Sequence, residues 1–465
     1  MTSDVKGELW SVPRKRGRGK QRNIMMRSLC GSALYLATFC LFEHQSAGNQ
    51  SASPASSPAY HGLASEARST GGGPSAISDF ALSSETSEAS DFANRDRGDE
   101  PGGKASSDGS SDESAFPQAL TPEGWRLAKP GYEFRFPQDH GPHPDYRTEW
   151  WYLTGNLQTA DGKEFGYELT FFRYGYRSPG QRIPVKSRFV IDDVKFAHFT
   201  VTDVRTKSFH VAERTSRGAY GDAGFLSGSR LAWIGDWELD LGQQFEAKAE
   251  NSGCAIDLEL DPEKSPVLEG ENGYSRKAST GDHASEYYSV TRMRTQGSVV
   301  IAGQTFQVSG LSWFDREWST NQLAPNQAGW NWFGIQLDDG SDLMLYQIRL
   351  RDGAIDPCSS GKWIDRDGHA VDIANGEFVL QPTRFWTTAD KHATYPIGWR
   401  LKIEKLGLEA EISTPVENQE LNVGVRYWEG CVRIKGTRDQ QPMNGKGYLE
   451  LTGFADSPEA RPDSR

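Results

Sequence analysis

Two carboxylates lie two residues apart in the aromatic stretch GLSWFDREWST, residues 310–320. If this stretch is extended, Asp315 and Glu317 share one face with Trp313 and lie about 7 Å apart along the strand. An aromatic wall would take them out of water and raise the pKa of at least one. A carboxyl group kept protonated in this way can give its proton to an alkene, and water then captures the resulting cation. We therefore expect Asp315 to be the acid of a hydratase-type reaction, with Glu317 positioning water or stabilising charge.

The aromatic residues around these carboxylates suit the same chemistry. Indole faces at Trp313 and Trp332 could stabilise a carbocation by cation–π attraction. The opposite face of the extended stretch would carry Phe314, Arg316 and Trp318. The alternative is that the Asp-Arg-Glu run is a charge network that braces one end of a barrel, since buried arginine–carboxylate groups often only fix geometry.

A second charged strand is predicted in HPDYRTEWWYLTGNL, residues 143–157. Alternation places Arg147 and Glu149 on one face with Trp151, Leu153 and Leu157, and leaves the other face to Trp150, Tyr152, Thr154 and Asn156. A lone buried charge is costly, but a bidentate Arg147–Glu149 pair with further hydrogen bonds is tolerable. We favour a structural pair, because nothing at this spacing supplies a nucleophile. If the face lines a ligand cavity, the expected ligand contacts are Arg147, Glu149, Trp151, Tyr152, Trp313, Arg316 and Trp332.

Histidines supply further candidates for acid–base chemistry. The stretch PQDHGPHPDYR brings together Asp139, His140, His143 and Asp145. A metal site is conceivable there, but three prolines make the stretch a loop without the regular geometry that ligands need. We favour a hydrogen-bonded loop, or His143 as a general base. His198, in FAHFTVTD, is expected to be a satisfied core histidine, with a cavity-facing acid–base role as the alternative.

The sequence lacks the motifs that are typical of several function classes. The chain has no G-x-S-x-G elbow, no phosphate loop, no dinucleotide fingerprint in a strand–helix–strand context and no H-E-x-x-H. We therefore expect no cofactor and no metal, and find no sequence support for a serine hydrolase. The formal net charge of −12 argues against a nucleic-acid partner, because phosphate binding needs a basic surface.

The chain begins with segments that do not look like part of a folded domain. Residues 1–43 combine a basic start with the apolar run LCGSALYLATFCLF, which predicts a signal peptide or a short anchor, and hence export with possible membrane association. Residues 44–117 are rich in Ser, Gly and Asp and are predicted to be a disordered linker. The three cysteines that remain, Cys254, Cys358 and Cys431, allow one disulfide at most, with the pair left open.

From about residue 118 the sequence pattern changes to short aromatic runs separated by Gly, Asp and Asn turns. This spacing predicts antiparallel sheet, as a sandwich or a barrel. The hairpin at 151–173 is echoed at 331–351, and each follows an Asp, Arg, Glu, Trp series, in DYRTEW and DREW. The echo predicts two related β-domains, over residues 118–300 and 301–460. Chance similarity between aromatic hairpins is the alternative.

These motifs resemble a known family. HPDYRTEWWYLTGNL, GLSWFDREWST, GWNWFGIQLDDGSDLMLYQIR, YWEGCVRIKGT and GKGYLELTGF are similar, in the same order, to the AttH family, which is related to the carotenoid 1,2-hydratases. The resemblance implies an all-β fold of two tandem lipocalin-like antiparallel barrels. It also implies a hydrophobic or polyene-like ligand. Some relatives are described as secreted hydrolases, and others accompany ABC transporters.

Four functions follow from these observations. The first is an exported protein that binds a lipophilic small molecule, as a carrier beside an ABC transporter. The second is a hydro-lyase that protonates an alkene through Asp315. The third is a secreted hydrolase that uses carboxylates or histidine, and the fourth is an envelope protein without catalysis. A barrel mouth or the cleft between the domains is the natural pocket.

Overall fold

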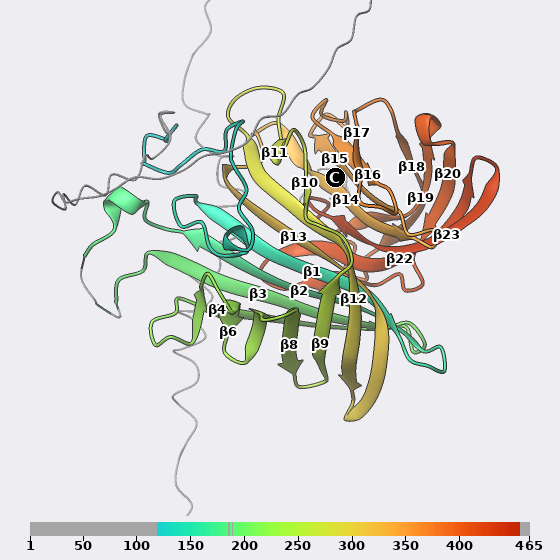
Figure 1. Ribbon diagram of the computed structural model, residues 1–465, viewed down its shortest axis with the longest axis horizontal. Coiled ribbons are helices and arrows are strands. Elements are labelled where there is room, and N and C mark those ends of the chain that lie inside the picture. The colour runs from blue at the N-terminus through green and yellow to red at the C-terminus, as the bar shows by residue number, and fades with distance from the viewer. Residues whose placement is uncertain (1–118, 185–186, 188, 456–465) are drawn as a thin grey trace, which may run out of the picture. The chain divides into compact units, whose positions relative to one another are not determined.

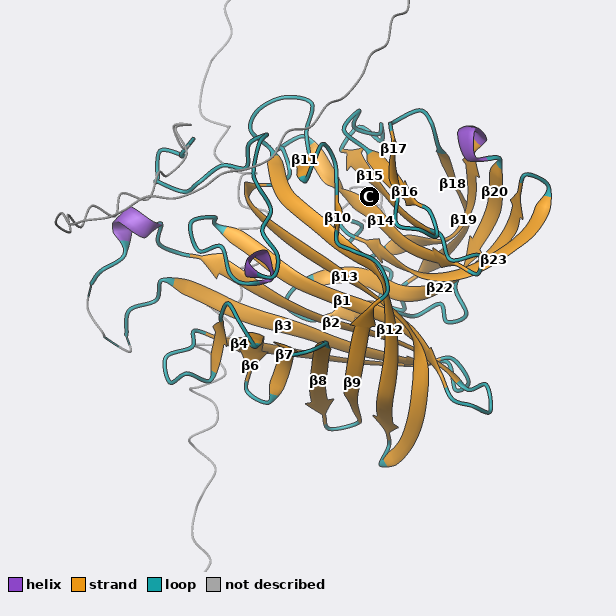
Figure 2. Ribbon diagram, viewed as in Figure 1, coloured by secondary structure: helices purple, strands orange, loops and turns teal. Residues whose placement is uncertain are grey.

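Aromatic and β-branched strands build nearly all of the described chain (Figures 1 and 2). The computed structural model describes residues 119–184, 187 and 189–455. Within these residues the helices are short 3₁₀ turns, η2 (Gln138–His140), η3 (Pro179–Gln181) and η4 (Glu404–Leu406), so this part of the chain offers no helical membrane span. The expected all-β class, with two antiparallel sheets, is confirmed.

The first sheet contains 13 of the described strands. They are β1 (Thr148–Gln158), β2 (Glu164–Gly175), β3 (Asp193–Asp203), β4 (Ser208–Ser216), β5 (Ala223–Phe225), β6 (Arg230–Ile234), β7 (Trp237–Leu241), β8 (Phe245–Asn251), β9 (Cys254–Pro262), β10 (Val267–Leu268), β11 (Tyr274–Arg276), β12 (Ala284–Ile301) and β13 (Gln304–Asn321). The order is β4-β3-β2-β1-β13-β12-β9-β8-β7-β6-β5. The Arg214 guanidinium on β4 donates to the Ile234 carbonyl on β6, so the two edges meet and the barrel nearly closes.

The second sheet contains ten of the described strands, in the order β17-β16-β15-β14-β23-β22-β20-β19-β18, with β21 paired to β22. They are β14 (Gln327–Leu337), β15 (Asp342–Leu350), β16 (Ser360–Ile364), β17 (Ala370–Ile373), β18 (Val379–Thr387), β19 (Thr394–Ile403), β20 (Leu408–Ser413), β21 (Glu420–Asn422), β22 (Arg426–Arg438) and β23 (Gln441–Leu451). Figure 1 shows this sheet in orange to red beside the first sheet, which runs from teal through green to gold.

Each sheet has its own apolar core, and a third cluster joins them. Large side chains fill the interior of the first sheet, including Trp151, Phe314 and Trp318. The third cluster takes Tyr152 and Trp313 from the first sheet and Trp332, Met344 and Tyr346 from the second. Because both sheets belong to one compact unit, these contacts are part of the fold.

An ion cluster also fastens the sheets together. The buried Asp342 of β15 accepts two hydrogen bonds from the Arg292 guanidinium of β12, at 2.8 and 3.0 Å. The Lys264 ammonium lies 2.7 Å from the other carboxylate oxygen of Asp342, and the Thr291 hydroxyl donates to that oxygen at 2.9 Å. Such a group, with each partner hydrogen-bonded, fixes the register of the contact.

The boundary between the sheets differs from the predicted domain boundary at 300/301. Strand β13 lies beyond that boundary, yet it pairs with β1 and β12 of the first sheet. The reason is that β12 and β13 form one long hairpin, whose turn falls at the predicted boundary. The sheets therefore divide between Asn321 and Gln327.

Two further predictions can be placed. The signal or anchor at 1–43 and the linker at 44–117 lie outside the described residues. The three cysteines of the described chain, Cys254, Cys358 and Cys431, are all free thiols, so none of them forms the disulfide that the sequence allowed.

Candidate functional site

The two charged strands of the sequence analysis are neighbours in one sheet. Strand β1 pairs with β13, with Tyr152 opposite Asp315 and Trp151 opposite Arg316. Alternation then gives the strand pair two faces. The barrel face points into the first sheet's core and carries Glu149, Trp151, Phe314, Arg316 and Trp318. The inter-sheet face points toward the second sheet and carries Tyr152, Trp313, Asp315 and Glu317. Both predicted alternations are confirmed within β1 and β13, whereas Arg147, which was expected on the face of Glu149, precedes β1.

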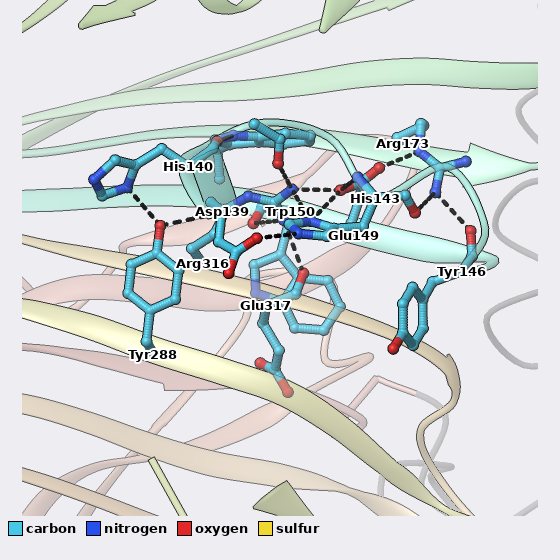
Figure 3. A network of polar contacts seen from close by, with 12 residues as sticks. Asp139, His140, His143, Tyr146, Glu149, Trp150, Arg173, Tyr288, Arg316 and Glu317 are labelled. Atoms are coloured by element: carbon cyan, nitrogen blue, oxygen red, sulfur yellow. Dashed lines mark hydrogen bonds and ion pairs between the residues drawn. The ribbon is translucent and has the colours of Figure 1, made fainter. Parts of the chain in front are cut away.

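Glu149 is the centre of the barrel face. Its carboxylate is fully buried and forms ion pairs with Arg173 of β2 and Arg316 of β13. The Arg316 guanidinium also donates to the Gly141 carbonyl at 2.6 Å and lies 3.7 Å from the centre of the Trp151 ring. Figure 3 shows these groups converging under the loop that precedes β1.

That loop is held by its own histidines. The His143 backbone N–H donates to Glu149 at 2.9 Å, and its ring stacks on Trp318 with ring centres 3.7 Å apart. The His143 Nε2 atom lies 3.2 Å from an Asp139 carboxylate oxygen, and the Nδ1 atom of His140 lies 2.6 Å from the Tyr288 hydroxyl oxygen. The loop is therefore hydrogen-bonded, as expected, and both histidine rings are engaged by neighbours.

The buried carboxylate of the barrel face is paired with cations. Burial alone would raise the pKa of Glu149, but the Arg173 and Arg316 guanidinium groups hold this pKa well below its usual range. Arg147 does not form the expected pair with Glu149. It precedes β1, and its guanidinium lies over the Tyr174 ring instead, 5.1 Å from the centroid. Arg173 takes its place because cross-strand pairing sets it opposite Glu149. This network suits the bracing of a loop.

Asp315 is the centre of the inter-sheet face. It is 4% exposed and accepts three hydrogen bonds of 2.6 Å, from the hydroxyls of Tyr287 and Ser289 and from the indole N–H of Trp313. Burial raises the pKa of Asp315 to about 7, against the three hydrogen bonds, which lower it. No arginine or lysine of the described chain forms an ion pair with it. Asp315 can therefore exchange a proton near neutral pH.

Glu317 has a different environment from its neighbour. Its carboxylate accepts a hydrogen bond from the Ser285 hydroxyl and lies 2.8 Å from the Lys277 ammonium. Lys277 also lies 5.0 Å from the ring centres of Tyr287 and Tyr346. Glu317 is thus neutralised by a cation, whereas Asp315 has only hydroxyl and indole donors. Such divergence is what separate acid and base roles require.

Aromatic rings surround Asp315. The Trp332 indole N–H donates to the Tyr287 oxygen at 3.2 Å, and the Trp332 ring meets Trp313 and Tyr152 edge to face, with centres 5.8 and 5.3 Å apart. Gly334 makes room for this arrangement, since an added Cβ would lie 2.4 Å from the Trp332 ring. The faces of these rings can stabilise a positive charge.

His198 lies further along the inter-sheet face, on β3. It is 1% exposed, and its Nδ1 atom lies 2.7 Å from the Tyr427 hydroxyl oxygen of the second sheet. Tyr427 also donates to Glu168 at 3.2 Å. The histidine is therefore partly satisfied, as expected by default, and it faces the second sheet. Of the predicted site residues, Asp315, Glu317, Trp313, Trp332, Tyr152 and His198 gather on the inter-sheet face, whereas Glu149, Trp151, Arg316 and His143 gather on the barrel face.

Sequence reasoning missed several polar residues of the inter-sheet face: Glu168, Glu269, Lys277, Tyr287, Ser289, Tyr427 and Glu429. A single glutamate in an aromatic strand looks like a solvent-facing position. The available signal was that GYELTFF and YWEGC have apolar residues on both alternating faces, which is typical of strands buried on both sides. A glutamate in such a strand must be buried.

Comparison with known proteins agrees with this fold. The family model described as AttH-like matches residues 127–454. The crystal structure of an AttH protein from Nitrosomonas europaea matches with a TM-score of 0.62 at 34% identity, over 70% of this chain and 98% of that chain. Kievitone hydratase from Nectria haematococca matches with a TM-score of 0.54 over 72% of this chain and 99% of that chain, and at 14% identity this likeness shows the fold alone. A search of curated proteins finds no match. Because the family model spans nearly all of the described residues, the chain belongs to the AttH-like family.

Proposed function

We propose that this protein adds water to a carbon–carbon double bond of a hydrophobic molecule held at the inter-sheet face, with Asp315 as the acid. The observation that carries the proposal is the environment of Asp315. It is a buried carboxyl group with a pKa near 7, surrounded by indole and phenol rings. The hydratase fold of a structural relative is consistent with it.

The reaction balances without a cofactor. Protonated Asp315 gives its proton to one alkene carbon, and the other carbon becomes a cation beside the Trp313 and Trp332 rings. Water attacks that carbon, and the proton it loses returns to the Asp315 carboxylate. A second route goes through Tyr287. Its hydroxyl donates to ionised Asp315, but it can rotate and accept from protonated Asp315 while it still accepts from the Trp332 indole. Its own proton then points away from Asp315, and a relay to the ligand becomes available.

A labelling experiment tests this reaction. The protein is incubated with a panel of isoprenoid and polyene alkenes in water enriched in oxygen-18, and products that gain one labelled water are detected by mass spectrometry. Asp315→Asn should lower the rate at least about 100-fold, because a positioned general acid contributes about 10²–10⁴. Asp161→Asn, in an exposed turn, is the matched control and should keep the wild-type rate. An unchanged rate in Asp315→Asn would rule out this acid.

Carriage without turnover is the second candidate. The aromatic inter-sheet face is the proposed place for a carried ligand too, because its rings suit a lipophilic molecule. In that case the panel compounds bind to the wild-type protein, no labelled product forms, and Asp315→Asn binds them equally well. Native mass spectrometry of protein purified from its host would then find a lipophilic molecule bound to it.

Export is part of the proposal and rests on the sequence of residues 1–43. Fractionation of the host, with detection of the protein outside the cytoplasm and a mass that lacks the N-terminal segment, supports a cleaved signal. Detection in the cytoplasm alone contradicts export.

A further inference from the structure

Two more carboxyl groups face each other across the sheets. Glu168 of β2 and Glu429 of β22 are both 0% exposed. The Tyr152 hydroxyl of the first sheet donates to Glu429 of the second at 2.7 Å. In the reverse direction, the Tyr427 hydroxyl of the second sheet donates to Glu168 of the first at 3.2 Å. The two sheets thus exchange one tyrosine–glutamate hydrogen bond each.

Each of these carboxyl groups uses only one of its oxygens. The Oε1 atom of Glu168 accepts from Tyr427 and from Thr170, and the Oε1 atom of Glu429 accepts from Tyr152. Both Oε2 atoms are buried and accept no hydrogen bond of ordinary geometry. The Thr200 hydroxyl, opposite Glu168 on β3, is the donor available to Glu168 within the protein, whereas Glu429 has no such second donor among the described residues. The buried hydroxyls of Thr154 and Tyr448 also lack partners, and Thr154 is the cross-strand neighbour of Glu168. Four unpaired polar groups in one interface are a strong sign that something else pairs with them.

Apart from His198, which lowers the pKa of Glu168, the charged neighbours of these two carboxyl groups are acidic. Glu429 faces Glu450 of β23 and Asp315 of β13, and Glu168 faces His198 of β3, which itself lies 3.4 Å from Glu213 of β4. Burial raises the pKa of Glu168, and burial together with the Glu450 and Glu168 carboxylates raises the pKa of Glu429 well above its ordinary value. Since Oε1 accepts hydrogen bonds in both groups, a bound proton belongs on Oε2 and makes that atom a donor.

A metal ion is a less suitable partner for the Oε2 atoms of Glu168 and Glu429 than an uncharged ligand. Among the described residues, the side chains with metal-ligand spacing are Asp365, Asp367 and His369, in the turn between β16 and β17. The inter-sheet carboxyl groups are not among them. An organic anion is also disfavoured, because it would have to lie among four acidic side chains.

We propose that Glu168 and Glu429 act as neutral carboxylic acids that donate hydrogen bonds from Oε2 to a carbonyl or hydroxyl oxygen of an uncharged, unsaturated ligand. The inference deepens the proposed function, because it places the polar end of the same ligand on the inter-sheet face whose other part contains Asp315. The substrate class becomes an alkene that also bears a ketone, ester or alcohol. Buried acids kept neutral for this purpose are known to serve as hydrogen-bond donors.

A pair of probes tests the inference. β-Ionone is an uncharged polyene ketone, and its hydrocarbon analogue lacks only the oxygen. Binding of each is followed by quenching of the tryptophan fluorescence at pH 7. We expect the ketone to bind about tenfold more tightly, as two net hydrogen bonds allow. Equal binding of the two probes, or no binding of either, overturns the inference.

Two pairs of substitutions separate a neutral acid from an ion. Glu168→Gln with Glu429→Gln keeps a neutral N–H donor in place of the O–H, so the preference for the ketone should persist within about threefold. Glu168→Met with Glu429→Met has no donor, so the preference should vanish while the hydrocarbon still binds. Loss of the preference in the glutamine variant would mean that a neutral donor at these two positions does not bind the ketone, and it would overturn the inference.

An infrared measurement checks the proton directly. The wild-type protein at pH 7 should show the C=O stretch of protonated carboxyl groups, and the glutamine variant should lose part of it. A wild-type spectrum identical to that of the variant in this region contradicts the inference even if both proteins bind the ketone. Asp315→Asn should leave the ketone preference intact, so a failure of Asp315 as the acid and a failure of this pair are distinguishable.

Discussion

The barrel face and the inter-sheet face of the β1–β13 pair each bury a carboxyl group among aromatic rings, but the two carboxyl groups have different partners. On the barrel face, the buried Glu149 has two guanidinium partners. On the inter-sheet face, Asp315 is held by hydroxyl and indole donors. A balanced buried network fixes geometry, whereas an unbalanced carboxyl group is poised to hold or release a proton. The comparison supports the proposal that chemistry takes place on the inter-sheet face and that the barrel face braces the loop.

The largest effect should come from breaking the balanced face. Glu149→Ala leaves Arg173 and Arg316 buried without their carboxylate, and we expect the free energy of unfolding to fall by about 3–5 kcal/mol. Urea denaturation measures this loss. Glu133→Ala removes an exposed ion pair with Arg135 and should change stability little. A loss no greater than that of this control would mean that the barrel face is not balanced by Glu149.

The two faces should also respond oppositely to pH. The folded-state pKa values of Asp315 and Glu269 are raised by burial, to about 7 and about 8, so their contribution to stability is complete below about pH 4 and is lost as the pH rises through 7–8. Glu149 has a depressed pKa, so its contribution is present above about pH 4 and is lost in more acidic solution.

The expected result is a stability maximum in mildly acidic solution. We expect the free energy of unfolding to fall by about 2 kcal/mol or more between pH 5.5 and pH 8.5. Asp315→Asn should lessen that fall, because it removes one of the groups that must ionise inside the protein. Urea titrations at both pH values check this, and a stability that rises with pH over this range would contradict it.

A smaller effect sharpens the role of Asp315. Tyr287→Phe removes one hydrogen bond that favours the carboxylate, so the pKa of Asp315 should rise. The stability cost should be about 1 kcal/mol. If the proposed reaction is observed, its decline at high pH should move to higher pH in this variant. An unchanged pH dependence of the rate would mean that Tyr287 does not influence the pKa of the catalytic acid.

The smallest effect concerns Arg147. Because its guanidinium lies over Tyr174 and not beside Glu149, Arg147→Ala should cost only about 0.5–1 kcal/mol. A loss as large as that of Glu149→Ala would restore the Arg147–Glu149 pair that the sequence suggested. Urea denaturation of both variants under the same conditions decides between the two arrangements.

Period-two alternation made part of this structure predictable. It placed Trp313, Asp315 and Glu317 on one face and Phe314, Arg316 and Trp318 on the other, because the side chains of a strand must alternate. The partners of Glu149 were not accessible in the same way. Arg173 reaches Glu149 through the β1–β2 register, which depends on turn length and on the core of the whole sheet.

The inter-sheet residues were hidden for a related reason. The apolar residues on both faces of GYELTFF and YWEGC indicate that Glu168 and Glu429 are buried. Which strands cover them depends on how the sheets pack, and no local pattern encodes that packing. The repeated Asp-Arg-Glu-Trp series does not by itself separate the sheets, because its two copies are cross-strand neighbours in the first sheet. The echoed hairpins that follow them lie in different sheets, as β1–β2 and β14–β15.

The reciprocal tyrosine–glutamate bonds limit how this chain can be divided. Cut between β13 and β14, each half would present to water an acidic surface shaped for the other half, with Tyr152 and Tyr427 deprived of their acceptors. Neither half is therefore a portable module for grafting or for exchange between relatives. Supplied together as separate polypeptides, the halves instead have the complementary surfaces that a split-protein reporter requires.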